Sequence, residues 1–138
     1  MRVVIDTNVL ISAIFWTGKP KQILNEVRRE KITFITSEFI LEELKNVLLR
    51  RDKPFKLSEE EAERVVTAMR GLALVVNIDT QLSVCQDEDD NKVLECAIDG
   101  HADCIITGDS HLLQLGSFQK IEIITVADFL RHFKGVVE

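Results

Sequence analysis

The sequence contains little that would interrupt a compact fold, with two prolines, six glycines and no tyrosine among 138 residues. No internal repeat, low-complexity segment or linker rich in Gly, Ser or Pro divides it, so we expect a single domain over residues 1–138. No uncharged stretch is long enough to cross a bilayer, and Asp6 interrupts the apolar run that a secretory signal would need. These absences predict a cytoplasmic protein without a membrane partner.

Cysteine and positive charge are also scarce. Three cysteines, an odd number without C-x-x-C spacing, are expected to be reduced core thiols. Cys96, His101 and Cys104 supply only three potential zinc ligands, and their spacing matches no usual zinc pattern. The net charge of −6 argues against an extended nucleic-acid-binding face, but it leaves open a local basic patch beside an acidic site.

Short β-type runs alternate with segments of helical periodicity, which is typical of an α/β protein. Strands joined through helices are expected to be parallel, so we predict three layers, with a mostly parallel central sheet flanked by helices. The expected strands are 2–5, 32–36, 72–78, 103–107 and 121–124. The expected helices are 8–15, 20–30 (opened by Pro20), 38–50, 58–70, 90–99, 110–114 and 126–133.

Local signals support several of these boundaries. Ser58 followed by Glu61 predicts a capping box at the start of helix 58–70. Gly71 and Gly100 follow the last periodic residues of two helices, as glycines just beyond a helix end do.

Two apolar strands each end in a carboxylate. Asp6 follows the run 3–5, and Asp109 follows 104–108. Because the carboxyl ends of neighbouring parallel strands open onto one crevice, these acids are expected to share it and to bind a hard cation there.

Helical phase selects a third acid. The apolar stripe of helix 38–50 consists of Ile40, Leu44, Val47 and Leu48. At about 100° per residue, Glu43 lies at the edge of this stripe, whereas Glu42 points nearly opposite and Glu38 falls well outside it. Glu43 is therefore the candidate, with an ordinary surface glutamate as the alternative.

A fourth acid comes from the acidic segment 87–90. The next helix has its apolar stripe at Val93, Leu94, Ala97 and Ile98. Asp90 is in phase with that stripe at the first turn, while Glu95 and Asp99 point away. Asp87 and Asp89 suit helix capping, and either could replace or join Asp90 at the site.

The nearest basic residues in sequence are badly placed to pair with these acids: Lys45 and Lys92 lie opposite in phase, and Arg2 lies at the far end of its strand. A bound cation would relieve the repulsion, and oxygen-only ligands suit Mg²⁺ or Mn²⁺. Phosphoryl-transfer chemistry follows from such an ion. The three histidines, His101, His111 and His132, lack a motif with a paired acid and are expected to be surface or packing residues.

With these residues in view, the chain resembles PIN-domain proteins, close to the bacterial and archaeal group described as toxin components of toxin–antitoxin systems. The resemblance spans nearly the whole chain and rests on segments 4–10, 37–48, 87–97 and 102–109, in that order and spacing. It implies the same four metal-binding acids, Asp6, Glu43, Asp90 and Asp109, with Asn8 and Thr107 as supporting polar groups.

The resemblance further implies a metal-dependent endoribonuclease that hydrolyses single-stranded RNA with Mg²⁺ or Mn²⁺ and leaves a 5′-phosphate. An antitoxin protein becomes a candidate partner, and homo-oligomers stay open. Two alternatives remain. One is an aspartate-based phosphatase or phosphoacceptor, although Asn8 replaces its second aspartate and Lys120 would enter a strand at the wrong end. The other is a non-catalytic RNA-binding module.

An acidic crevice cannot itself attract a polyanion, so RNA would need a basic surface nearby. The sequence offers two clusters, Arg28, Arg29 and Lys31, or Arg50, Arg51 and Lys53. Both could equally be solvated residues at helix ends, where the helix dipole favours positive charge.

Overall fold

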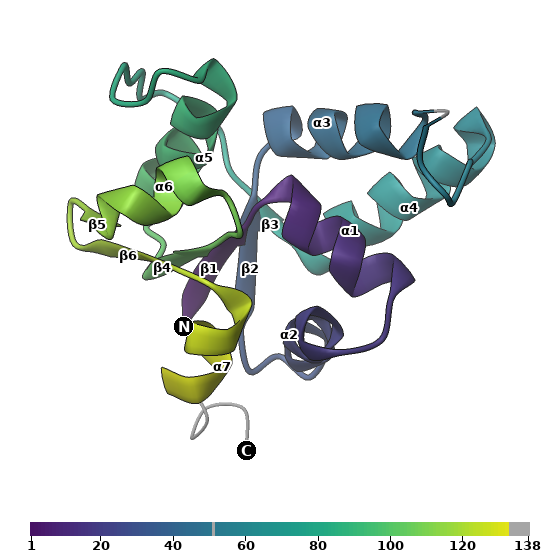
Figure 1. The fold of residues 1–138 in the computed structure, drawn as a ribbon, viewed down its shortest axis with the longest axis horizontal. Helices are drawn as coiled ribbons and strands as arrows, with labels where there is room; N and C mark the ends of the chain where they lie inside the picture. Colours follow the sequence, from purple (N-terminus) through teal and green to yellow (C-terminus); the bar gives the residue numbers. More distant parts are fainter. Residues whose placement is uncertain (51, 133–138) are drawn as a thin grey trace.

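The computed structural model describes residues 1–50 and 52–132 (Figure 1). The strands are β1 (Arg2–Ile5), β2 (Thr33–Thr36), β3 (Leu74–Val75), β4 (Cys104–Ile106), β5 (Ser117–Phe118) and β6 (Ile121–Ile124). The helices are α1 (Thr7–Phe15), α2 (Lys19–Arg28), α3 (Glu38–Leu48), α4 (Glu59–Leu72), α5 (Glu88–Asp99), α6 (Ser110–Leu115) and α7 (Val126–His132). None of the helices in these two ranges is both long and apolar enough to span a bilayer.

The strands form one sheet in the order β3-β2-β1-β4-β6-β5. All neighbours are parallel except β5 and β6, which pair antiparallel. The prediction of an α/β fold with a mostly parallel central sheet and flanking helices is confirmed. β1 occupies the centre, and its residues Val3, Val4 and Ile5 are almost completely buried. A strand covered on both faces needs such a continuous apolar run.

The helices divide into groups around this sheet. Helix α5 packs against β1, β2 and β4, while α1 contacts α2 and α3, and α2 contacts α7. Helices α3 and α4 run side by side away from the sheet (Figure 1). The predicted capping box starts α4: the amide of Glu61 donates to Ser58 Oγ at 3.1 Å, and the amide of Ser58 donates to Glu61 Oε1 at 2.9 Å.

The sheet edges differ most from the sequence prediction. The expected strand 72–78 shortens to Leu74–Val75, because α4 continues through Leu72. The short edge strand β5 was not predicted, since two residues show no periodicity. The other boundaries fall within two residues of those predicted, and residue 133 of the expected last helix lies outside the described ranges.

Of the two glycines expected just beyond helix ends, Gly100 lies there, as the C-cap of α5, and Gly71 does not. Gly71 lies inside α4, and Gly100 ends α5 with φ −87°, so the left-handed residue that follows is His101, with φ 52°. Gly100 is needed for space, because a Cβ there would lie 2.4 Å from Ile35 Cγ2 and 2.9 Å from the Cys96 carbonyl oxygen. Close packing of α5 on β2 therefore selects glycine at this position.

Candidate functional site

The two strand-end acids lie at neighbouring strands. β1 and β4 pair in parallel with Ile5 opposite Ile106, so Asp6 and the segment leading to Asp109 leave the same edge of the sheet. Each acid also begins a helix. Asp6 caps α1 by accepting from the Val9 amide at 3.0 Å, and Asp109 caps α6 by accepting from the amides of His111 at 2.7 Å and Leu112 at 3.2 Å.

Thr107 connects the two acids. Its hydroxyl group donates to Asp6 Oδ2. The hydroxyl oxygen, Thr107 Oγ1, accepts from the Asp109 amide at 3.0 Å. Thr107 is completely buried and Asp6 is 8% exposed, so the pair is held beneath the surface of the site. Thr107 was predicted as a supporting polar group, and these contacts are consistent with that role.

Glu43 reaches the same region from α3. Its Oε1 accepts from the hydroxyl of Thr7, the first residue of α1, and the glutamate is partly buried. The neighbouring Glu42 is exposed, while Lys45 turns away to pair with Glu63 at 2.8 Å. Glu38 pairs with Arg70 on the outside. The glutamate that borders the apolar stripe is thus the one that faces Thr7.

Helix α5 presents its acids at its first turn. Asp87 is the N-cap and accepts from the Asp89 amide at 2.9 Å. Asp87 and Asp89 are exposed, whereas Asp90 is 7% exposed, as its phase with the apolar stripe predicts. Capping by Asp87 leaves Asp90 directed inward.

Glu95 lies outside the apolar stripe of α5, as its helical phase predicts, yet it is buried. Glu95 is 1% exposed because the segment before α5 folds over it, and it accepts from the Leu82 amide at 2.9 Å. Lys92 approaches it at 3.4 Å. Asp99 likewise accepts from the amides of Asp79 and Thr80, at 2.7 and 3.0 Å. Helical phase gave the direction of Glu95, but it carries no information on what covers that face.

All four candidate acids line one open cavity of about 460 Å³. The other polar side chains that line it are Thr7, Asn8, Asn46, Arg50, Asp87 and Asp89. Two of these were missed as site residues, Thr7 and Asn46, whereas Arg50 had been named only as part of a basic cluster for RNA. Asn46 lies three residues after Glu43, so helical phase could have found it. Thr7 gave no comparable signal.

Burial and mutual repulsion raise the pKa values of three of these acids. Burial is the largest cause of the raised pKa of Asp6, with the charge of Asp109 adding to it. Burial also raises the pKa of Glu43, reinforced by Asp89. For Asp90, burial together with Asp109 and Asp87 raises the pKa to about 6. A positive charge placed among them would offset this repulsion.

The donor set fits a hydrated hard cation. Every candidate ligand is a carboxylate or amide oxygen, and Mg²⁺ binds through one or two carboxylates while it keeps several waters. Across residues 1–50 and 52–132, no three His, Cys, Asp or Glu side chains stand close enough together to enclose an ion as placed. Each oxygen of Asp6 accepts one hydrogen bond, which leaves further lone pairs for water or metal. The arrangement therefore suits an ion held partly through water.

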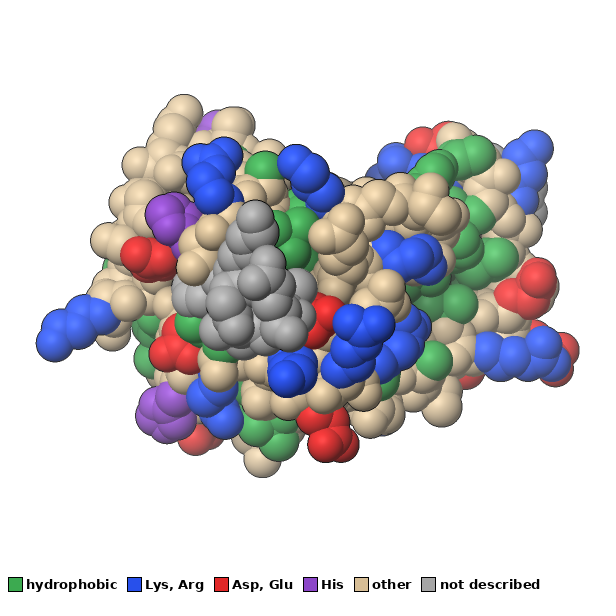
Figure 2. Space-filling model, turned by 90° about the horizontal axis from the view of Figure 1, so that it is seen from below, with side chains coloured by type: hydrophobic (Ala, Val, Ile, Leu, Met, Phe, Trp, Pro, Cys, Tyr) green, Lys and Arg blue, Asp and Glu red, His purple; other side chains and the backbone are tan. Residues whose placement is uncertain are grey.

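The first predicted basic cluster and Arg50 of the second lie at different edges of the sheet. Arg28, Arg29 and Lys31 precede β2, whose first amide, that of Thr33, donates to the Met1 carbonyl at 2.8 Å. This is the amino edge of the strands, opposite Asp6. Figure 2 views the molecule from that side and shows Lys and Arg side chains spread over this face, with acidic side chains among them. Arg50 instead lines the acidic cavity, where it pairs with Asp52 at 3.0 Å. Arg51 of the second cluster lies outside the described residues.

Among solved structures, the fold is similar to the crystal structure of VapBC2 from Rickettsia felis bound to a DNA fragment from their promoter. The TM-score is 0.64, and the match covers 91% of this chain and 98% of that chain at 13% identity. At this identity the likeness shows the fold alone.

Sequence comparison gives a closer relationship. An uncharacterized protein of Methanocaldococcus jannaschii is 34% identical over 99% of this chain and 94% of its own length. The PIN domain family matches residues 2–111, which include all four candidate acids. PIN domains are generally nucleases and typically use divalent metals. With most of its length matched in this way, the chain belongs to the PIN domain family.

Proposed function

We propose that this protein is an endoribonuclease that hydrolyses single-stranded RNA with Mg²⁺ or Mn²⁺ as its cofactor. One observation carries the proposal: Asp6, Glu43, Asp90 and Asp109 come from four separate segments of the chain and line one cavity at the carboxyl edge of a parallel sheet. The raised pKa values of Asp6, Glu43 and Asp90 mark this cavity as electrostatically strained without a cation.

The four acids are proposed as the metal-binding set, with Asp87 and Asp89 close enough to contribute through water. When bound, such a cation lowers the pKa of a water and offsets the charge that develops on the phosphate and the leaving oxygen. Thr107 and Thr7 orient Asp6 and Glu43 by hydrogen bonds, and Asn8 adds a polar group at the exposed rim. Such supporting contacts fix the positions of ligands and tune their basicity.

Arg50 is proposed to contact the RNA backbone. It is the cavity's positively charged lining residue, and phosphate contacts of this kind supply most of the affinity for a polyanion. The cluster at residues 28–31 lies at the opposite edge of the sheet, so it cannot contact the same nucleotides.

A role as the toxin of a toxin–antitoxin pair follows from the resemblance to the bacterial and archaeal PIN-domain toxins, and the likeness to the Rickettsia felis VapBC2 fold is consistent with it. An antitoxin protein is then the proposed partner, and a homo-oligomer is a second proposed assembly. Growth arrest on expression, relieved by co-expressing the product of the neighbouring gene, would support this role; normal growth would oppose it.

The phosphatase or phosphoacceptor alternative has less support. Lys120 precedes β6, which runs parallel to β4, so this lysine lies at the amino edge, away from the acids. A phosphorylated protein after incubation with acetyl phosphate would favour that alternative.

The decisive experiment is a cleavage assay with purified protein on single-stranded RNA, single-stranded DNA and duplex RNA. We expect cleavage of single-stranded RNA in Mn²⁺ or Mg²⁺, none in chelator, and 5′-phosphate ends. RNA binding without cleavage in either metal would instead support the non-catalytic module.

A further inference from the structure

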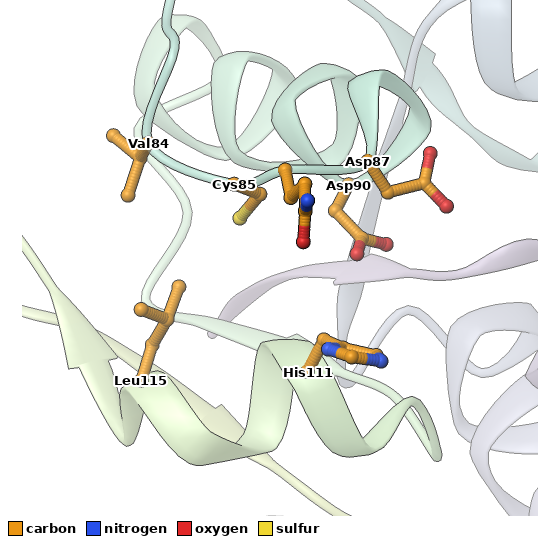
Figure 3. Close-up of a pocket in the computed structure, with 7 residues that line it drawn as sticks. Val84, Cys85, Asp87, Asp90, His111 and Leu115 are labelled. Atoms are coloured by element: carbon orange, nitrogen blue, oxygen red, sulfur yellow. The ribbon is translucent and has the colours of Figure 1, made fainter.

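A second hollow, of about 360 Å³, lies beside the acidic cavity and shares Asp87 and Asp90 with it. Its remaining lining consists of Val84, Cys85, Gln86, His111 and Leu115. Figure 3 shows Val84 and Leu115 facing each other across one end, with Asp87, Asp90 and His111 toward the other. The hollow is thus apolar at one end and continuous with the candidate catalytic acids at the other.

Its apolar walls are unusually open to solvent. Only five large hydrophobic side chains are classed as exposed in the described ranges, and two of them, Val84 at 45% and Leu115 at 37%, form this pair of walls. A single exposed apolar residue needs no explanation, but two that face each other across a hollow next to charged groups form a surface suited to a ligand.

The wall formed by Val84 belongs to the segment before α5, and buried side chains of α5 hold this segment in place. Asn91, which is 1% exposed, accepts from the amides of Val84 and Cys85 at 3.1 and 2.8 Å and donates to the Cys85 carbonyl at 3.0 Å. The buried Glu95 fixes the amide of Leu82 in the same segment. These contacts give an otherwise irregular segment a defined position, so the hollow exists before a ligand arrives.

We propose that this hollow binds one nucleobase of the nucleic acid whose phosphate lies at the acidic cavity. A base has two apolar faces and a hydrogen-bonding edge; Val84 and Leu115 match the faces, and the Gln86 amide and His111 imidazole can donate to or accept from the edge. The volume lies within the roughly 300–1,000 Å³ typical of small-molecule sites. This inference rests on the proposed function, since only a phosphate held at the acids brings a base to this position.

Photocrosslinking tests the site without requiring cleavage. The probe is a single-stranded oligouridine that carries one 4-thiouridine, irradiated with the protein in chelator and in Ca²⁺, a cation that also prefers oxygen ligands. We expect crosslinks in segments 84–86 and 111–115, and their loss in a Val84→Ser, Leu115→Ser double variant. Leu74→Ser is the matched control, because Leu74 is 45% exposed on β3 at the other end of the sheet. A DNA probe with 4-thiothymidine tests whether the ribose matters.

Kinetics tests the contribution of the base. In the wild type, an abasic nucleotide beside the cleaved bond should lower kcat/KM by about tenfold, a typical effect of losing apolar contact in a pocket. The double variant should lose a similar factor on the intact substrate and nothing more on the abasic one.

The outcomes separate the two proposals. Crosslinks in the hollow without cleavage would retain the base site and reject the hydrolytic function. Crosslinks elsewhere, or none at all, would overturn the base site, whatever the cleavage assay shows. So would losses of kcat/KM from the double variant and from the abasic nucleotide that multiply when the two are combined.

Discussion

At the scale of single residues, the strand-end acids have both a structural and a chemical role. Asp6 and Asp109 each cap a helix, and Asn can accept the same amide hydrogen bonds. We therefore expect Asp6→Asn and Asp109→Asn to fold normally but to lose RNA cleavage by at least about 100-fold, since each removes an anionic ligand. Circular dichroism checks the fold, and a gel-based assay in Mn²⁺ measures the rate of RNA cleavage. Near wild-type cleavage by either variant would place the chemistry elsewhere.

Glu42 and Glu43 offer a matched pair on one helix. Glu43 accepts from Thr7 inside the acidic cavity, while the exposed Glu42 does not line it. Glu43→Gln should reduce cleavage by roughly 10- to 100-fold, the range typical for disturbed metal sites, and Glu42→Gln should leave it within about twofold. Equal losses in the two variants would contradict the assignment of Glu43.

For single residues, prediction from the sequence succeeded where helical periodicity determines the direction in which a side chain points. Phase separated Glu43 from Glu42 and Asp90 from its exposed neighbours, and the four selected acids line a common cavity, although their catalytic role is still a prediction. It did not predict the burial of Glu95, which is covered by a segment without periodicity, or the contact of Thr7, which crosses between two helices. Such contacts depend on tertiary placement, which no local pattern encodes.

At the scale of elements, the approach of α5 to β2 makes a testable demand on Gly100. An added Cβ would collide with the buried Ile35 side chain and the Cys96 carbonyl. We expect Gly100→Ala to lower the free energy of unfolding by about 1–3 kcal/mol, as overpacking does. Gly71→Ala is the control: it lies inside α4 with open space around it, and it should raise the free energy of unfolding by roughly 0.5–1 kcal/mol. Urea titration of both variants measures the difference. Unfolding free energies that change in the same direction would contradict this packing argument.

Arg28 of the first basic cluster and Arg50 of the second lie at opposite edges of the sheet, which predicts unequal effects on RNA binding. For a variant that binds but does not cleave, such as Asp109→Asn, adding Arg50→Gln should lower the slope of log affinity against log salt by about 0.7, the value for one single-strand phosphate contact. Adding Arg28→Gln should leave the slope unchanged, because Arg28 lies at the amino edge of the strands. Fluorescence anisotropy at several salt concentrations provides the slopes, and an effect confined to Arg28 would reverse the assignment.

Element boundaries show what the sequence could and could not predict about the fold. Buried strands such as β1 and capped helices such as α4 were predicted closely, because continuous apolar runs and capping boxes are local signals. The edge strands β3 and β5 contain two residues each, and their pairing depends on neighbours distant in sequence. The expected strand 72–78 was too long, because α4 continues through Leu72 and the pairing with β2 ends shortly after Val75.

For the whole molecule, the acidic site should destabilise the metal-free protein. Burial and neighbouring acids raise the pKa of Asp90 to about 6, above its unfolded value of about 4. The folded state therefore retains a proton that the unfolded state releases, so the contribution of Asp90 to stability in chelator should be greatest below pH ~4, fall up to pH ~6 and stay low above it. Thermal melts of wild type and Asp90→Asn across this range isolate the contribution, and the stability of wild type relative to the variant should fall from pH ~4 to pH ~6. A difference that rises over the same interval would contradict the raised pKa.

Adding Mn²⁺ at neutral pH should reverse the loss of stability that the clustered acids cause in the metal-free protein. A ligand that binds only the native state contributes about 2.7 kcal/mol at a hundredfold excess over its dissociation constant. Asp6→Asn should melt higher than wild type in chelator, yet gain much less from the metal. Equal shifts in the two proteins, or no shift in wild type, would exclude a metal site built on Asp6.

The position of β1 also determines when the acidic site can form during synthesis. Asp6 and Thr107, which are hydrogen-bonded in the folded protein, are 101 residues apart in the chain. The strand β1 is therefore made long before β4, with which it pairs. A ribosome that adds roughly 5–20 residues per second needs several seconds to make that interval. During those seconds the nascent chain carries Asp6 and Glu43 but lacks Asp109, so the candidate nuclease site is incomplete while the chain is still beside its own messenger RNA.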